Sequence, residues 1–349
     1  MSDPVRIAVV GAGLVGRRHA MAVAATASAT LACLVDPVEE ARALAADFGV
    51  GAFASLDKAL AAGGMDAVIL ATPNRLHLEG AMAVISAGLP VLVEKPLATD
   101  VAGALDLVEA AEAAGVPLAT GHHRRHNPLI AAAKEMIEEG RLGIIATVHA
   151  NAWFRKPDDY FHTAWRRSAG AGPVFINLIH DIDILRHLVG DIVEVQAFEA
   201  NAVRGHDVED TAVVVLRFAN GALGTVNVCD AAVAPWSWEL TARENSAYPA
   251  TGEDAYRIGG TKGSLSLPNL TLWTHADDRG WWAPISATKV PFDADDPLVR
   301  QVEQFAAVVR DGVPPLVSGR DGLAALAVVE AVKTAAATGT PVRPRHTHT

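Results

Sequence analysis

The sequence predicts an α/β fold, with a doubly wound parallel sheet in the first domain and an antiparallel or mixed sheet in the second. Three observations lead to this prediction. The chain of 349 residues is too long for a single ordinary hydrophobic core. Short apolar runs alternate with Ala-rich stretches of helical length as far as residue 121. Beyond that residue, strand-like runs follow one another directly.

The first part of the chain contains short runs rich in Val, Ile and Leu, which we expect to form strands. They are 7–10, 31–35, 67–71, 91–93 and 116–119. Between them lie amphipathic stretches that we expect to be helices, at 14–25, 38–48, 76–87 and 101–114. Strands that are apolar throughout are buried on both faces, as in a parallel sheet covered by helices. Right-handed crossovers then give the doubly wound arrangement.

The second part, residues 122–349, has a different order of elements. Helix-like stretches cover 129–139 and 181–189, and strand-like runs cover 144–154, 211–218, 222–229 and 264–267. Asn220-Gly221, between two of these runs, is a strong signal for a hairpin turn. Successive strands predict an antiparallel or mixed sheet, and two late helices at 297–311 and 319–337 complete the domain. We therefore place the domain boundary between residues 121 and 122.

The composition indicates a globular protein and argues against some classes of partner. Hydrophobic residues make up 50% of the chain and charged residues 20%. A formal net charge of −11 argues against binding to nucleic acid or to an anionic membrane surface, since both select basic proteins. The sequence shows neither a secretory signal nor an apolar run of the roughly 20 residues that a membrane span needs. Cys33 and Cys229 lie in apolar runs, so we expect buried free thiols in a cytoplasmic protein.

A glycine-rich turn follows the first expected strand. Its residues are Gly11, Ala12, Gly13, Leu14, Val15 and Gly16, in the pattern GxGxxG. In this context Gly11 allows a tight turn, Gly13 lets the backbone approach a pyrophosphate, and Gly16 permits close packing of helix and strand. The N-terminus of the following helix offers N–H groups and the positive end of its dipole to phosphates. The turn therefore predicts a dinucleotide-binding Rossmann domain.

Asp36 strengthens this prediction and indicates which cofactor binds. It ends the second strand about twenty residues after the last glycine, where a carboxylate can accept both ribose hydroxyls. The same carboxylate repels the 2′-phosphate of NADP, and Glu39 and Glu40 add negative charge. Arg42 is a nearby cation that could offset this repulsion. NAD is therefore the predicted cofactor, with NADP as the alternative.

Two further segments follow strands of the predicted parallel sheet, at the edge where ligands bind in such sheets. The first comprises Thr72, Pro73, Asn74 and, at the start of the next helix, His77. The second comprises Glu94, Lys95 and Pro96. Proline disfavours a helical conformation for the preceding residue and keeps the lysine extended. Most lysines are simply solvated surface groups, but this position makes Lys95 a candidate functional residue.

In their order along nearly the whole chain, these motifs resemble those of the Gfo/Idh/MocA oxidoreductases (glucose-fructose oxidoreductase, inositol dehydrogenase, rhizopine catabolism). The resemblance rests on the glycine turn, 71–74 with His77, 94–96, Gly121 with Arg124-Arg125, and His180 with Asp183. Glu94-Lys95-Pro96 is much more specific than the glycines. The resemblance implies an NAD-binding Rossmann domain at 1–121. It also implies a substrate-binding domain at 122–349 whose large, open, mostly antiparallel sheet forms a homodimer or homotetramer.

The family's chemistry is hydride transfer between a nicotinamide and a secondary alcohol of a sugar, cyclitol or related hydroxy compound. By resemblance, Lys95 contacts the substrate hydroxyl and the nicotinamide, and His180 accepts the proton. Arg124 and His123 match positions near the nicotinamide and the substrate. These residue types suit the reaction, because a hydride leaves a carbinol carbon only as the hydroxyl proton leaves, which needs a base. A cationic lysine stabilises the developing charge on oxygen.

The sequence departs from the family at one position. The family commonly has an aspartate four residues before the histidine, and here that residue is Ile176. Isoleucine cannot bind a hydroxyl, so another polar group must assist, or the substrate lacks that hydroxyl. Asn177 and Asp181 are candidates. Asp183 could orient the ring of His180 from the same helix face, although capping and dipole compensation explain the two aspartates equally well.

The loop 153–167 is rich in aromatic and charged residues. Tyr160, Trp165 and Arg166 are candidates for contacts with the face and hydroxyls of a sugar. The alternative is that these rings pack an interface or a lid. A second aromatic cluster, 236–248, is better explained by sheet packing or a subunit contact.

Two groups of histidines have spacings that could suggest a metal site. His122, His123 and His126 fall in a segment that is metal-free in the family. His346 and His348 belong to a tail that we interpret as a frayed terminus. No metal is therefore predicted.

Two other functions remain open. A non-catalytic family member that binds a nucleotide and regulates a partner would be expected to lack the lysine or the histidine, and both are present here. An NAD-dependent glycosidase of the same fold keeps its cofactor and catalyses no net oxidation. Release of NADH with an alcohol substrate would distinguish the dehydrogenase from the glycosidase.

Overall fold

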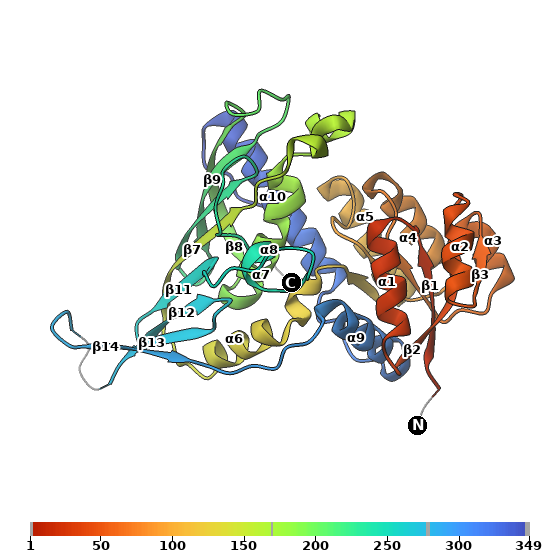
Figure 1. The fold of residues 1–349 in the computed structure, drawn as a ribbon, viewed down its shortest axis with the longest axis horizontal. Coiled ribbons are helices and arrows are strands. Elements are labelled where there is room, and N and C mark those ends of the chain that lie inside the picture. The colour runs from red at the N-terminus through yellow and green to blue at the C-terminus, as the bar shows by residue number, and fades with distance from the viewer. Residues whose placement is uncertain (1–2, 169, 277–279, 346–349) are drawn as a thin grey trace. The chain divides into compact units, whose positions relative to one another are not determined.

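The computed structural model of the chain describes residues 3–168, 170–276 and 280–345 (Figure 1). The chain forms two compact units. Of the described residues, the first contains 3–127 together with Asp295–Leu326, and the second contains Pro128–Ala294 together with 327–345.

The first unit is built on a six-stranded parallel sheet in the order β3-β2-β1-β4-β5-β6. Its strands are β1 (Val5–Val10), β2 (Ala29–Val35), β3 (Gly51–Phe53), β4 (Ala67–Leu70), β5 (Val91–Val93) and β6 (Leu118–Thr120). The connecting helices are α1 (Leu14–Ala24), α2 (Glu40–Asp47), α3 (Leu56–Ala62), α4 (His77–Ser86) and α5 (Val101–Ala114). The strand order reverses between β1 and β4, which confirms the predicted doubly wound sheet.

Sequence analysis did not predict β3 and α3. The strand is only three residues long, begins with Gly51, and is at best half-buried. Such a segment has no apolar run to reveal it, because its position depends on pairing with β2 rather than on its own composition.

The first unit also contains a helix from late in the sequence. α9 (Pro297–Asp311) buries Leu298, Val302 and Phe305 in the core that packs against β1 and β2. Its bounds agree with the predicted helix at 297–311, whereas its packing against the first unit was not predicted. An amphipathic pattern shows that one face of a helix is buried and does not show against which sheet. The compact units therefore differ from a single division at residue 121.

The second unit is built on an eight-stranded sheet in the order β14-β13-β12-β11-β7-β10-β9-β8. Its strands are β7 (Ile145–Trp153), β8 (Ile192–Ala200), β9 (Thr211–Phe218), β10 (Leu223–Cys229), β11 (Tyr256–Gly260), β12 (Gly263–Leu267), β13 (Thr271–His275) and β14 (Ile285–Lys289). The pair β7–β10 is parallel and the other pairs are antiparallel. The predicted large, mostly antiparallel sheet is thereby confirmed.

Helices accompany this sheet in the second unit (Figure 1). They are α6 (Pro128–Glu138), α7 (Ile179–Val189), the short α8 (Trp238–Thr241), and the part of α10 (Gly319–Thr338) after Leu326. A π-helical turn, Val174–Leu178, leads directly into α7.

The Asn220-Gly221 turn joins β9 and β10 in an antiparallel hairpin, as predicted. Gly221 has a φ of +90°, a conformation that favours glycine. Burial alternates along β9, so that one face of this strand is covered and the other is open.

The two cysteines are buried and free, which agrees with the sequence prediction. Burial raises the pKa of the Cys33 thiol to about 11. Within the described residues, no helix has the length and apolar character needed to cross a membrane.

Candidate functional site

The glycine turn between β1 and α1 combines two crowded positions with one open position. Gly11 has a φ of +94°, and a Cβ there would clash with the carbonyl oxygen of Ala71. A Cβ on Gly16 would clash with the carbonyl oxygen of Gly11. At Gly13, by contrast, a Cβ would have no described atom within 4 Å. The fold therefore requires two of the glycines, whereas Gly13 leaves open space beside the backbone.

The N-terminus of α1 faces this open space with its backbone donors. Gly13 is the N-cap residue and provides no side-chain cap, and no acidic residue lies in the first turn of α1. Leu14 is 82% exposed and Val15 is also exposed. N–H groups at such an uncapped helix start are available to an anion. This geometry fits the pyrophosphate of a dinucleotide.

The Asp36 carboxylate is held beside the turn by two backbone donors. Its Oδ2 accepts a hydrogen bond from Ala12 N at 2.7 Å, and its Oδ1 accepts one from Val38 N at 3.1 Å. Each carboxylate oxygen has two lone pairs, so both keep capacity for a ribose hydroxyl. Arg42, the cation that could have offset Asp36, is paired instead with Glu39 at 2.7 Å.

A cavity of about 510 Å³ opens next to Asp36 within the first unit. Gly11, Asp36, Thr72 and Pro73 line it, as do residues that sequence analysis missed, including Leu56, Arg75 and Leu76. Leu56 went unnoticed because α3 was not predicted. Thr72 Oγ1 is buried with no hydrogen-bond partner in the described part of the chain. An apolar wall with an unsatisfied hydroxyl fits the nucleoside half of the cofactor.

Glu94 is buried behind Lys95 rather than turned to solvent. His19 Nε2, on α1, lies 2.7 Å from Glu94 Oε1, and Lys95 N donates to Glu94 Oε2 at 3.1 Å. Burial alone would raise the pKa of this carboxyl, but the hydrogen bond from His19 and the nearby charges of His123 and Lys95 lower it to about 2. Gly121 completes the packing, because a Cβ there would approach the Glu94 side chain within 2.9 Å. Sequence analysis missed His19, which lies outside every recognised motif.

His77 joins the two predicted strand-end segments to each other. Its side chain is fully buried. Its Nδ1 lies 2.7 Å from the Pro96 carbonyl oxygen, and its Nε2 lies 2.9 Å from the Thr72 carbonyl oxygen. The structure thus brings Thr72, His77 and the segment 94–96 together at one edge of the sheet. Pro73 and Asn74 are exposed there.

The segment after β6 places Arg124 and His123 in the first unit with Lys95. Arg124 is buried and His123 half-buried, in a short helical turn. Arg125 is anchored to Asp321 at 3.0 Å. No group of three metal-ligating side chains is found in the described chain, His122, His123 and His126 included. His346 and His348 lie outside the described residues.

In the second unit, His180 is buried in the first turn of α7. The preceding π-helical turn carries Ile176, which is half-buried, and Asn177, which is buried. Such turns occur often at functional sites. The Asn177 amide nitrogen donates to Glu239 Oε1 at 3.4 Å, while its Oδ1 has no partner among the described residues. Sequence analysis missed Glu239, which reaches this helix from α8.

Asp181 has a tertiary partner that sequence analysis could not predict. The hydroxyl of Tyr256 on β11 donates to Asp181 Oδ1, and the Tyr256 ring stacks on Trp238 of α8. Leu178, the N-cap residue of α7, provides no side-chain cap, and Asp181 lies in the first turn of the helix. Asp183 is fully buried. Trp238 is buried as well, which agrees with a packing role for the cluster 236–248.

The aromatic loop 153–167 is folded into short turns within the second unit. The guanidinium of Arg166 lies 4.1 Å from the ring centroid of Tyr160 and donates to the Tyr160 carbonyl. Burial raises the pKa of the Tyr160 hydroxyl. Lys156 is buried and paired with Asp230 at 3.2 Å. The structure therefore brings Tyr160 and Arg166 together, and the Arg166 guanidinium also lies 5.6 Å from the ring centroid of Trp165, which is 57% exposed.

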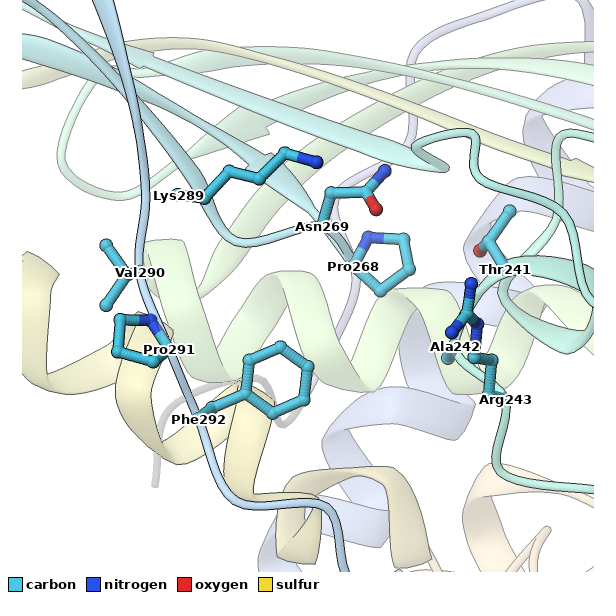
Figure 2. Close-up of a pocket in the computed structure, with 9 residues that line it drawn as sticks. All are labelled: Thr241, Ala242, Arg243, Pro268, Asn269, Lys289, Val290, Pro291 and Phe292. Carbon is cyan, nitrogen blue, oxygen red and sulfur yellow. The ribbon is translucent and has the colours of Figure 1, made fainter.

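A separate cavity of about 500 Å³ lies in the second unit (Figure 2). Its lining consists of Thr241, Ala242, Arg243, Pro268, Asn269, Lys289, Val290, Pro291 and Phe292. Figure 2 shows Arg243 and Lys289 on different sides of Pro268 and Asn269. Thr241, Ala242 and Arg243 of this lining belong to the cluster 236–248, for which the sequence favoured a packing role.

Comparisons with known proteins agree with the geometry of both units. Residues 5–122 match the NAD-binding Rossmann fold of an oxidoreductase family, and residues 134–343 match the C-terminal alpha/beta domain of the same family. The chain is 31% identical to inositol 2-dehydrogenase 2 of Saccharopolyspora erythraea, covering 95% of this chain and 93% of that protein. It is 29% identical to 1,5-anhydro-D-fructose reductase of Ensifer adhaerens, covering 96% and 97%.

A solved structure shares the fold of the whole chain. The WlbA dehydrogenase of Bordetella pertussis, in complex with NADH and UDP-GlcNAcA, is 30% identical. The match covers 97% of this chain and 98% of that one, with a TM-score of 0.78. Together with the family matches, it confirms the resemblance inferred from the order of the motifs. The first unit carries an NAD-binding Rossmann fold, and the chain is an oxidoreductase.

We predict opposite consequences for two alanine substitutions in the glycine turn. Gly13→Ala should leave the melting temperature nearly unchanged but weaken NAD⁺ binding at least about tenfold, because the methyl group occupies the space open to the pyrophosphate. Gly16→Ala should lower the melting temperature, because its Cβ overlaps the Gly11 carbonyl. Thermal unfolding and NAD⁺ titration measure the two effects. Unchanged NAD⁺ affinity in folded Gly13→Ala would contradict the pyrophosphate assignment.

Proposed function

Because this chain belongs to the Gfo/Idh/MocA oxidoreductase family, we propose that it transfers a hydride between NAD and a secondary alcohol of a sugar, cyclitol or related hydroxy compound. The observation that most supports the proposal is the cofactor cradle, by which we mean the glycine turn 11–16 with the open space at Gly13 and the uncapped start of α1. Relatives named for inositol and for anhydrofructose support the substrate class. When bound, NAD supplies the hydride acceptor.

We further propose that Lys95 and His180 carry the proton chemistry. His180 would accept the hydroxyl proton during alcohol oxidation, and the Lys95 ammonium would stabilise the oxygen as negative charge develops on it. Lys95 suits this role because Glu94 fixes its backbone N–H at 3.1 Å. His123 and Arg124 would add contacts to the cofactor or the substrate, as would Tyr160 and Arg166 in the second unit, with Trp165 stacking on the substrate from its exposed position.

The open face of the second unit's sheet supports a homodimer or homotetramer. Phe198 on β8 is 73% exposed, and Val213 and Val215 on β9 and Leu223 on β10 are exposed as well. Apolar side chains gathered on neighbouring strands are typical of a subunit interface. The free cysteines agree with a reducing compartment, which supports the proposal of a cytoplasmic location.

The cofactor preference should depend on Asp36. We expect NAD⁺ to bind more tightly than NADP⁺, because like-charge contact with a 2′-phosphate costs on the order of several kcal/mol. Asp36→Ala should reduce or reverse this preference, since Arg75 lines the same cavity. Titration of both nucleotides by fluorescence measures the dissociation constants, with Asp57→Ala on the same cavity wall as a control. Equal or tighter binding of NADP⁺ to the unaltered protein would refute the assignment.

The hydride-transfer proposal is tested by removing its two proposed catalytic groups separately. Lys95→Ala should lower kcat strongly while NAD⁺ affinity stays within roughly tenfold, because a group acting in the transition state changes kcat. His180→Asn should lose at least ~10² in oxidation rate, and the rise of the rate with pH should disappear with the imidazole.

The measurement is NADH formation from a panel of sugars, cyclitols and hydroxy acids across pH, with His275→Asn on β13 as a matched control. If no compound in the panel yields NADH but a glycosidic bond is cleaved without net oxidation, the glycosidase function is supported in place of the dehydrogenase function. An unaltered pH profile in His180→Asn would assign the base to another group.

Ile176 should restrict the substrate. A fully hydroxylated ring would place a hydroxyl against this side chain, and an unsatisfied buried polar group costs ~1–3 kcal/mol. We therefore expect a deoxy or anhydro compound, such as 1,5-anhydro-D-glucitol, to be preferred over myo-inositol. Ile176→Asp should shift the ratio of kcat/KM values towards myo-inositol by about tenfold, and Ile176→Leu should not. If the unaltered protein already prefers myo-inositol and Ile176→Asp leaves that ratio unchanged, Ile176 does not line the site.

A further inference from the structure

The segment 172–178, which precedes α7 and its His180, contacts a carboxylate from a distant part of the second unit. Glu209 lies between β8 and β9, and its side chain is only 2% exposed. Its Oε1 accepts a hydrogen bond from Val174 N at 3.1 Å. Val174 is the first residue of the π-helical turn that precedes α7. A buried acceptor therefore fixes the point at which this turn begins.

The same carboxylate packs directly against the backbone at Gly172. A Cβ on residue 172 would clash with the Glu209 carboxyl group. No other residue type leaves this space free, so Gly172 and Glu209 fit as a pair. Glu209 thus contacts the chain at Gly172 and at Val174 N, where the π-helical turn begins.

Lys333 on α10 compensates the charge of Glu209. Its Nζ lies 2.6 Å from Glu209 Oε2 and 2.7 Å from Glu199 Oε2. Burial alone would lower the pKa of Lys333, but the hydrogen bonds to both carboxylates raise it above its ordinary value, so the ammonium stays charged. Burial raises the pKa of Glu199, although Lys333 opposes this effect. Each oxygen of the Glu209 carboxylate therefore has a partner, one on the π-helical turn and one on α10.

We propose that Glu209, held by Lys333, is a positioning residue that sets the place of the His180 imidazole. This inference rests on the proposed function, in which His180 accepts the substrate proton. His180 is six residues beyond Val174, and the π-helical turn lies between them. A shift at the start of this turn is passed on to the helix that follows. A misplacement of a catalytic group by about 1 Å can cost ~10²-fold in rate.

The test uses substitutions at Glu209 and Lys333 in the full chain, with a matched control. Glu209→Ala removes both contacts, Glu209→Gln keeps an acceptor for Val174 N, and Lys333→Met removes the cation. The control is Lys134→Met on α6, which breaks the surface pair of Lys134 and Glu138 at 3.4 Å. The probes are 1,5-anhydro-D-glucitol and myo-inositol with NAD⁺, and the readouts are kcat, KM and the dissociation constant of NAD⁺.

We expect Glu209→Ala to lower kcat at least about tenfold while NAD⁺ affinity stays within about twofold. Glu209→Gln should retain most of the activity, because the amide oxygen still accepts from Val174 N. The kcat of Lys333→Met should lie between the values of these two variants, and the kcat of Lys134→Met should equal that of the unaltered protein. A general loss of folding would instead lower NAD⁺ binding as well and would not be rescued by glutamine.

Hydrogen–deuterium exchange provides a second readout that needs no substrate. Lys333→Met should increase exchange in the peptides that cover 172–180, while peptides from the first unit stay unchanged. Unchanged exchange there, or a folded Glu209→Ala variant with kcat within about twofold of the unaltered protein, would overturn the inference. If His180→Asn leaves the rate unchanged, the proposed role of His180 fails. Exchange at 172–180 then still decides whether Glu209 fixes the segment.

Discussion

The first unit depends on the close approach of α1 to the turn before it. The Gly11 carbonyl occupies the space that a Cβ on Gly16 would need. Because the helix begins this close to β1, Ala12 N reaches the Asp36 carboxylate at 2.7 Å, and the open side of Gly13 faces the uncapped helix start. The exposed donors at the start of α1 and the Asp36 carboxylate thus lie next to the same close steric contact. A side chain at Gly16 would disturb both.

A buried charge connects this cofactor cradle to the proposed catalytic lysine. Glu94 accepts from the Lys95 backbone and contacts His19 on the same α1 helix that begins at the glycine turn. Burying a carboxylate is costly unless its oxygens are hydrogen-bonded, and here both are. The pKa of Glu94, lowered to about 2, reflects that compensation. His77 adds a link between the Thr72 and Pro96 carbonyl oxygens at the same sheet edge. The backbone of the lysine is therefore fixed by a buried carboxylate that is itself hydrogen-bonded.

The parts of this structure that could be predicted from sequence are those with a local signature. Continuous apolar runs predicted the parallel strands, and the glycine spacing predicted the turn. The three-residue β3 has no such signature, and neither does His19, whose partner lies 75 residues away. The amphipathic α9 was predicted at the right residues, but its packing against the core of the first unit was not, because periodicity identifies a buried face without its partner. Long-range pairing is the common reason for these failures.

The same distinction explains why the cofactor is easier to read from this sequence than the substrate. The residues of the glycine turn are neighbours in the chain, so their spacing alone describes the cradle. The surroundings of α7 are assembled from distant segments. Tyr256 of β11 binds Asp181, Glu239 of α8 reaches Asn177, and Glu209 fixes the turn before them. No motif contains all of these residues. A change at Ile176 or Glu239 could therefore alter which alcohol is accepted while the glycine motif, and with it the family assignment, stays the same.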